Sequence, residues 1–363
     1  MKIVIAPDSF KGSASSIDIA TWIENGIHSV IPDCETVKIA IGDGGEGSLD
    51  AVLSAGFTVH SYEVTGPVGN TVTARIALKG ATAFIEMAEA SGLAQLPNKE
   101  LRALDATSFG TGELILRALD LGATQIILAV GGSACTDAGA GTLQALGAQL
   151  LDSNGNQIAL GGRGLATCAS IDVSGLDPRL ADVKFTLASD VENPLLGELG
   201  AARVFAPQKG ASSEDVELLE NALTSFASII GGHYATAPGA GAAGGFGFMA
   251  YAFLKATQRS GIELILDLVG FHQHLKGADI VITGEGRFDS QSAGGKAPWG
   301  IMHAASKLSI PTYLICGDTD TPDSSHFTEI LTLASLEPDI AKSISNPAPL
   351  VTQLGAKIAE LIK

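Results

Sequence analysis

Two hydrophobic patterns alternate in the first part of the chain. Short runs of β-branched and other apolar residues, Lys2–Ala6 and Thr36–Ile41, have strand length and are bounded by turn residues. Each run is followed by a longer segment with helical spacing of apolar positions, at Ser16–Val30 and about Ser48–Ala55. This order of strand and helix predicts a parallel sheet with helical crossovers.

The pattern changes after the second helix. Three strand-like runs follow one another closely, and the turn LKGAT between the last two predicts antiparallel pairing: Thr58–Val64, Thr71–Lys79 and Thr82–Met87. Two buried strands and three helices are expected further on, the strands at Gln125–Val130 and Lys184–Ala188 and the helices at Ser108–Leu121, about Thr142–Leu146 and Ser213–Ile230. A second, mixed α/β domain is therefore predicted over residues 65–277.

The parallel pattern returns toward the C-terminus. Apolar strands are expected at Asp279–Thr283, Thr312–Cys316 and Glu329–Ala334, with helices around Ala297–Leu308 and Pro349–Leu361. Both chain ends are thus predicted to build one parallel α/β domain, residues 1–64 and 278–363, into which the second domain is inserted. The length of 363 residues agrees with two domains.

Charge and composition exclude several classes of partner and cellular location. A formal net charge of −17 repels nucleic acid and anionic membrane surfaces, so neither is expected as a partner. An anionic substrate would then depend on a few well-placed cations. The four cysteines form no C-x-x-C pair, the N-terminus has the pattern of a strand rather than a signal peptide, and no apolar run reaches the roughly 18 residues of a membrane span. We expect a cytoplasmic enzyme with reduced thiols.

Candidate catalytic and binding residues follow the carboxyl ends of the predicted strands. In parallel α/β sheets ligands bind at the carboxyl ends of the strands. Five such ends carry glycine or serine together with a carboxylate: Asp8-Ser9-Phe10-Lys11, Gly42-Asp43-Gly44-Gly45-Glu46-Gly47, Gly131-Gly132-Ser133 with Asp137, Ser189-Asp190 with Asn193, and Glu285-Gly286-Arg287-Phe288-Asp289 followed by Lys296. Five together are hard to explain by packing alone.

The segment GDGGEG has the spacing G-x-G-x-x-G after a strand and before a helix, which is typical of a nucleotide loop. Asp43 and Glu46 lie inside this turn and would repel a pyrophosphate unless a cation intervened. The loop therefore favours Mg²⁺ and a triphosphate over a dinucleotide.

Lysines and carboxylates in these loops suggest phosphoryl transfer. Lys11 and Lys296 share their loops with Asp and Ser and are candidates to contact phosphate, as is Lys209 in PQKGA. Asp190 ends an apolar strand, where it could take the proton from a substrate hydroxyl or hold Mg²⁺ together with Asn193. Asp8 and Asp43 are alternatives as the base, although we expect them rather to serve Mg²⁺ or its water ligands.

Other catalytic classes lack their motifs. The sequence contains no Walker loop and no G-x-S-x-G elbow, and no histidine falls in the five loops. Cys135 has no histidine nearby in sequence, and a small buried thiol is the simpler interpretation. Hydrolysis by a serine or cysteine triad is therefore not supported.

Seven blocks, in order along nearly the whole chain, resemble the bacterial glycerate kinase family: APDSFKGS (6–13), GDGGEGS (42–48), GGSACTDAGAG (131–141), SDVENPL (189–195), PQKGA (207–211), PGAGAAGGFG (238–247) and ITGEGRFDSQSAGGKAP (282–298). The resemblance implies phosphorylation of D-glycerate by ATP, with 2-phosphoglycerate as the favoured product. It also implies a flavodoxin-like domain with an inserted second domain. Ser189, Ala206 and Cys135-Thr136 depart from the family's usual residues, which affects only fine substrate preference.

These observations define the expected site. The catalytic residues are expected to be Asp190, Lys11 and Lys296, and the metal ligands Asp43 and Asp190. Residues expected to bind substrate or nucleotide are Asp8, Ser9, Gly44, Gly45, Glu46, Gly47, Gly131, Gly132, Ser133, Asp137, Asn193, Lys209, Glu285, Arg287 and Asp289. ATP and Mg²⁺ are the expected cofactors, D-glycerate is the expected substrate, and the protein would be a monomer or homodimer.

Two other functions stay open at this point. One is a dinucleotide-binding oxidoreductase acting on a small hydroxy acid, which GDGGEG would suit. The other is a protein that binds a nucleotide or small acid without turnover. The sequence also leaves open which hydroxyl of glycerate is phosphorylated and which domain holds ATP.

Overall fold

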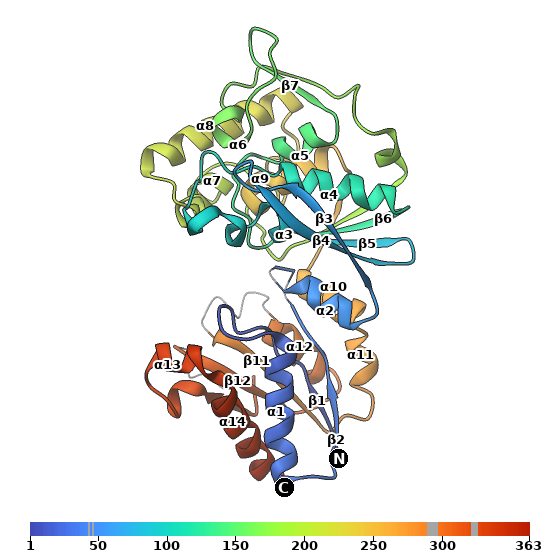
Figure 1. Ribbon diagram of the computed structural model, residues 1–363, viewed down its shortest axis with the longest axis vertical. Coiled ribbons are helices and arrows are strands. Elements are labelled where there is room, and N and C mark those ends of the chain that lie inside the picture. The colour runs from blue at the N-terminus through green and yellow to red at the C-terminus, as the bar shows by residue number, and fades with distance from the viewer. Residues whose placement is uncertain (43, 46, 289–296, 321–325) are drawn as a thin grey trace. The chain divides into compact units, whose positions relative to one another are not determined.

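The computed structural model describes residues 1–42, 44–45, 47–288, 297–320 and 326–363 (Figure 1). The chain separates into two compact units. Unit 1 comprises Met1–Asp43, Asp50–Gly56 and Gly261–Lys363, and unit 2 comprises Gly44–Leu49 and Phe57–Ser260. Among the described residues, no helix combines the length and apolar character needed to cross a membrane.

Unit 1 contains a five-stranded sheet in which every pair is parallel. Its order is β13-β12-β11-β1-β2, and the strands are β1 (Lys2–Ile5), β2 (Glu35–Lys38), β11 (Ile280–Phe288), β12 (Thr312–Thr319) and β13 (Glu329–Thr332). Counted within the unit, this is the order 2-1-3-4-5 of flavodoxin-like sheets. The predicted parallel sheet is confirmed, and its strand order reverses between β1 and β11.

Helices cover both faces of this sheet. On one face, α1 (Ser16–Val30) and α14 (Pro347–Ile362) lie side by side over Ile3 and Ile5 of β1 (Figure 1). On the other face, α12 (Ala297–Ser306) packs against β11 and β12. The unit is completed by the 3₁₀ helix η6 (Leu333–Ser335) and by α10 (Gly261–Leu268), α11 (Phe271–His274) and α13 (Ile340–Ser345).

Unit 2 contains a six-stranded mixed sheet of order β10-β9-β6-β5-β4-β3. The strands are β3 (Thr58–Thr65), β4 (Thr71–Lys79), β5 (Thr82–Glu86), β6 (Gln125–Ala129), β9 (Lys184–Ala188) and β10 (Thr257–Arg259). β3, β4 and β5 pair antiparallel, as predicted, and β5, β6, β9 and β10 pair parallel. The carboxyl ends of these four strands therefore meet at one edge of the sheet.

The helices of unit 2 enclose a large apolar core around this sheet. They are α3 (Ala88–Ser91), α4 (Phe109–Asp120), α5 (Ala140–Ala145), α6 (Gly161–Leu165), α7 (Ala201–Phe205), α8 (Ser213–Ile230) and α9 (Ala242–Ala252), with 3₁₀ turns η1 (Leu93–Gln95), η2 (Pro97–Lys99), η3 (Pro178–Asp182) and η4 (Pro207–Lys209). A two-stranded antiparallel ribbon joins β7 (Gln149–Leu151) to β8 (Ser170–Asp172). This ribbon was not predicted, because its strands are too short for a pattern.

The units divide the chain at slightly different positions from those predicted. The chain changes unit at 43/44, 49/50, 56/57 and 260/261, whereas the prediction placed two changes, at 64/65 and 277/278. β3 belongs to unit 2 because it pairs with β4 along its whole length. The helix α2 (Ser48–Ser54) begins within Gly44–Leu49, a segment that is part of unit 2 although the strand before it is part of unit 1.

Candidate active site

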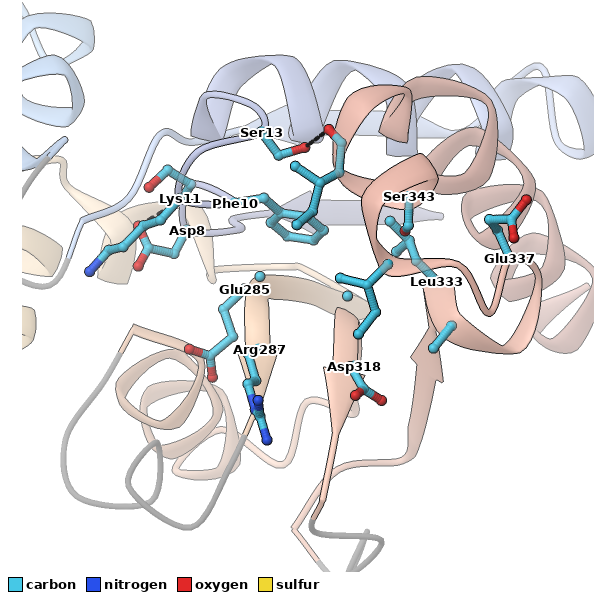
Figure 2. Close-up of a pocket in the computed structure, with 16 residues that line it drawn as sticks. Asp8, Phe10, Lys11, Ser13, Glu285, Arg287, Asp318, Leu333, Glu337 and Ser343 are labelled. Carbon is cyan, nitrogen blue, oxygen red and sulfur yellow. Dashed lines mark hydrogen bonds between the residues drawn. The ribbon is translucent and has the colours of Figure 1, made fainter. Parts of the chain in front are cut away.

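Unit 1 has a cavity of about 370 Å³ at the carboxyl ends of β1, β11 and β12. It lies at the reversal of strand order between β1 and β11, where ligands bind in open α/β sheets. Figure 2 shows Asp8 and Lys11, from the loop after β1, at one end of this cavity with Glu285 and Arg287 of β11. The structure thus brings together five residues predicted from two distant parts of the sequence: Asp8, Ser9, Lys11, Glu285 and Arg287.

Charges of both signs meet at that end of the cavity. The carboxylates of Asp8 and Glu285 are buried, at 5% and 6% exposed, and the Asp8 Oδ1 accepts a hydrogen bond of 2.7 Å from the Ser9 amide. Lys11 is exposed, and Arg287 forms a long ion pair of 3.8 Å with Asp320 while its side chain stays 66% exposed. Exposed cations above buried carboxylates suit an anionic ligand that carries a hard cation with it.

Close backbone packing shapes the floor of this cavity. A Cβ atom at Gly317 of β12 would lie 2.3 Å from the carbonyl oxygen of Gly286 of β11, so a side chain there is excluded. The two strands therefore stay paired beyond their predicted ends, with Arg287 opposite Asp318 and Phe288 opposite Thr319. This extension carries Arg287 to the cavity.

The second group of predicted residues lies at the carboxyl edge of the sheet in unit 2. The register places Glu86, Ala129 and Ala188 side by side at the ends of β5, β6 and β9. The loops that continue from these strands include Gly131-Gly132-Ser133 and Ser189-Asp190. The predicted residues of these two loops are therefore neighbours.

Lys209 reaches this edge from η4. Its side chain is buried, at 2% exposed, and the ammonium Nζ donates hydrogen bonds of 3.0 Å to the Ser133 Oγ and 2.5 Å to the Cys135 carbonyl. Burial lowers the pKa of Lys209, while the nearby Cys135 and Asp137 act to raise it. The Ser133 oxygen accepts from Lys209, so the hydroxyl hydrogen can be donated to a ligand.

Asp137 has a different environment from the one expected of a ligand contact. Its side chain is fully buried, and it accepts hydrogen bonds from the amides of Ser108, Gly139 and Gly141 at 2.8, 3.1 and 3.2 Å. The hydroxyls of Ser108 and Thr107 also donate to it, at 3.0 and 3.3 Å. These donors lie at the starts of α4 and α5, where a negative charge is favourable. The arrangement gives Asp137 the role of joining two helix ends beside the site.

Gly44 and Gly45 of the segment GDGGEG pack directly against this edge. The Gly44 carbonyl accepts a hydrogen bond of 3.3 Å from the Gly131 amide, and a Cβ at Gly131 would lie 2.5 Å from the Gly45 Cα. The amides of Gly47 and Leu49 donate to the buried carboxylate of Glu86 at 3.2 and 2.9 Å. These two amide groups are therefore occupied within the protein rather than presented to a phosphate.

Glu86 is the residue that sequence reasoning missed. It ends β5, a strand that was predicted, but the residues directly after it, Met87 and Ala88, are apolar and did not mark a site. A carboxylate at the end of an otherwise apolar buried strand was the available signal. It fixes the start of α2 through a contact between segments 37 to 39 positions apart.

Side-chain hydrogen bonds from Gln258 and Asn193 stabilise the loop after β9. Asp190 is half-buried at the strand end, and the Gln258 side chain donates to the carbonyls of Ser189 and Val191 at 3.0 and 3.1 Å. The Asn193 side chain donates to the Leu199 carbonyl at 2.8 Å, so Asn193 stabilises the loop. These hydrogen bonds fix the backbone on either side of Asp190.

Four predicted residues, Asp43, Glu46, Asp289 and Lys296, lie outside the described residues. In the part of the chain that the structure describes, no three or more His, Cys, Asp or Glu side chains are gathered as metal ligands would be. Mg²⁺ bound with a nucleotide needs only one or two protein carboxylates, because phosphates and water supply the other ligands. The carboxylates of Asp8 and Glu285, which line the same cavity, fit that donor set.

Polar loops at the carboxyl ends of parallel strands, and a cavity at the point where strand order reverses, are typical of an α/β enzyme with a small-molecule substrate. Comparison with known proteins gives the family. The family model for the glycerate kinase family matches residues 3–363, and the chain belongs to that family. It is an ATP-dependent kinase.

Individual relatives agree with this assignment. The chain is 49% identical over 325 residues to the glycerate 2-kinase of Escherichia coli K12, covering 87% of this chain and 85% of that protein. It is 46% identical over 324 residues to the glycerate kinase of Bacillus subtilis 168, with the same coverage. A crystal structure described as glycerate kinase 2 from Salmonella typhimurium LT2 superimposes with a TM-score of 0.85 at 44% identity, covering 100% of this chain and 98% of that one. A kinase assignment replaces the oxidoreductase alternative that GDGGEG left open.

Proposed function

We propose that this enzyme transfers the γ-phosphoryl group of ATP to the 2-hydroxyl of D-glycerate, giving ADP and 2-phosphoglycerate. The proposal is carried by the family match along residues 3–363. The choice of the 2-hydroxyl is supported by the relative from Escherichia coli, which is named a glycerate 2-kinase and shares 49% identity.

Phosphoryl transfer to a hydroxyl group involves three events. The hydroxyl oxygen forms a bond to the γ-phosphorus, the bond from that phosphorus to the β,γ-bridging oxygen breaks, and the hydroxyl proton must be accepted. The transferring phosphoryl group carries negative charge throughout, so catalysis depends mainly on positioning and on nearby cations. Lys11 and Arg287 are the described cations that line the cavity of unit 1.

Asp190 is the proposed acceptor of the proton. It is half-buried rather than enclosed, and the Gln258 and Asn193 side chains fix its loop. Asp8, the described rival, is more deeply buried, and one of its carboxylate oxygens already accepts a hydrogen bond from the Ser9 amide, so it is less accessible to a substrate hydroxyl. A carboxylate with access to substrate at a fixed strand end is the better base.

Ser133 is proposed to contact glycerate. Its hydroxyl oxygen is occupied by the Lys209 ammonium, which directs its hydrogen elsewhere and favours donation to the glycerate carboxylate. Because the Lys209 charge is buried beneath Ser133, it also adds a positive potential at this edge of an otherwise acidic protein.

Mg²⁺ is proposed to enter with ATP. It would neutralise part of the triphosphate charge, and Asp8 and Glu285 would hold it beside Lys11 and Arg287. A protein of net charge −17 needs such a cation to accept a triphosphate.

A coupled assay for ADP release tests the function. We expect ADP to form only when ATP, Mg²⁺ and D-glycerate are all present, and excess EDTA to abolish it. L-glycerate and lactate serve as matched acceptors that lack the correct configuration or the second hydroxyl. ADP release at the same rate without any acceptor, or undiminished activity in EDTA, would contradict the proposal.

A further inference from the structure

The cavity of unit 1 has a second, apolar end that phosphate chemistry does not explain. Figure 2 shows Phe10 in the middle of the cavity and Leu333 farther from Lys11, toward Glu337. Two isoleucines of α13, Ile340 and Ile344, also line the cavity. Phe10 and Leu333 are buried, at 3% and 2% exposed, and form the base of this wall. The wall is built from three segments, the loop after β1, η6 and α13.

The two isoleucines are exposed although they line a cavity. Ile340 is 62% exposed and Ile344 is 48% exposed, and they lie one helical turn apart on α13. The Ser13 hydroxyl donates a hydrogen bond of 2.7 Å to the Ile344 carbonyl, which ties α13 to the loop carrying Lys11. Two apolar side chains held on one side of a cavity offer a flat planar group a surface to pack on.

The cavity is larger than a three-carbon acid requires. Its volume of about 370 Å³ is within the range of roughly 300–1,000 Å³ typical of pockets for larger organic ligands. Glycerate is polar at every carbon and would leave the apolar wall uncovered. The ligand that fits has an apolar planar part at one end and negative charge at the other.

The charged residues of the lining determine which end of the cavity the negative part of that ligand would occupy. Lys11 and Arg287 line the end near β1 and β11, where the carboxylates of Asp8 and Glu285 would be bridged to phosphate by Mg²⁺. The described lining near α13 has the carboxylate of Glu337 and no lysine or arginine, so phosphate would be repelled there. We propose that this cavity is the nucleoside site of ATP, with the base against Ile340 and Ile344 and the phosphates directed toward Lys11 and Arg287. The inference rests on the proposed function for the identity of ATP as the phosphoryl donor.

Equilibrium binding of ADP tests the proposal. Ile344→Asp places a carboxylate on the apolar wall, and its exposure means that folding should tolerate the change. We expect at least a tenfold higher Kd for ADP, a similar rise in the KM for ATP, and a KM for D-glycerate within about twofold of wild type. Ile340→Asp, at a still more exposed position, should act in the same direction.

The matched control is Leu361→Asp. Leu361 is 56% exposed, lies on α14 of the same unit and does not line the cavity. This variant should bind ADP as wild type does. Unchanged ADP affinity in both isoleucine variants, or a rise in the glycerate KM instead of the ADP Kd, would overturn the proposal.

Different results would contradict the proposed function and the proposed nucleoside site. If wild-type enzyme binds ADP but does not phosphorylate D-glycerate, the proposed function is wrong, and the comparison of ADP affinities still decides the nucleoside site. If wild-type enzyme phosphorylates D-glycerate but the isoleucine variants bind ADP normally, the function stands and the nucleoside site is elsewhere.

Discussion

The Lys209 ammonium donates a 3.0 Å hydrogen bond to the Ser133 hydroxyl, although the two residues are 76 positions apart. The contact connects η4 to the loop after β6 and encloses a charged side chain that is 2% exposed. Removing a charge from water is costly unless hydrogen bonds compensate, and here the Ser133 oxygen and the Cys135 carbonyl provide them. The cost should therefore be measurable as a dependence of stability on pH.

For Lys209, burial lowers the pKa of the folded state below the ordinary value of 10.5. Between those two pKa values the unfolded chain binds the proton while the folded protein releases it, so stability rises with pH through that window. We predict that the free energy of unfolding of wild type, minus that of Lys209→Met, increases as pH rises toward 10.5. Urea unfolding of both proteins at neutral and alkaline pH measures this difference, and a constant difference would show that burial does not perturb Lys209.

Asp137 should be a stability residue more than a ligand contact. Asp137→Ala leaves the amides of Ser108, Gly139 and Gly141 without their acceptor inside the protein. We predict a loss of about 3–5 kcal/mol in the free energy of unfolding, as for other broken buried networks.

The control for this loss is Asp105→Ala, which removes an exposed ion pair with Arg163. Exposed pairs contribute about 0–1 kcal/mol, so this variant should unfold nearly as wild type does. A similar small effect for both variants in urea unfolding would rule out a structural role for Asp137.

Asp190→Asn tests the proposed base. The amide is nearly isosteric but cannot accept the proton from the substrate hydroxyl, so kcat should fall by roughly 10²–10⁴. Affinity for ADP should stay close to that of wild type, measured by equilibrium binding. Glu192→Gln, an exposed position in the same loop, should keep normal turnover. If Asp190→Asn instead loses ADP affinity with kcat little changed, Asp190 is a binding residue and the base must be sought at Asp8 or Asp43.

The sequence was most informative where local interactions decide the structure. α1 and α8 begin and end as predicted, because Ser15 and Ser212 cap their N-termini and the helices carry regular apolar faces. β4 and β9 were likewise predicted at their observed bounds. β11 and β12 run several residues beyond their predicted ends, because they remain paired through the polar residues Arg287 and Asp318.

The site was predicted residue by residue but not as an arrangement. Glycines, serines and carboxylates at strand ends identified loops that the structure places at the carboxyl edges of the two sheets. The pattern could not show that Lys209 lies beneath Ser133 or that Glu86 holds the start of α2, since both contacts depend on segments brought together by the fold. The same limit hid the role of Asp137, whose donors come mostly from α4 and α5.

The most direct test of the proposed function is the identity of the phosphorylated product. Purified enzyme is incubated with ATP, Mg²⁺ and D-glycerate, and the mixture is followed by ³¹P NMR and by adding enolase, which accepts 2-phosphoglycerate and not 3-phosphoglycerate. We expect one 2-phosphoglycerate for each ADP, and phosphoenolpyruvate to form when enolase is added. Formation of 3-phosphoglycerate, or of free phosphate with unmodified glycerate, would contradict the proposed function.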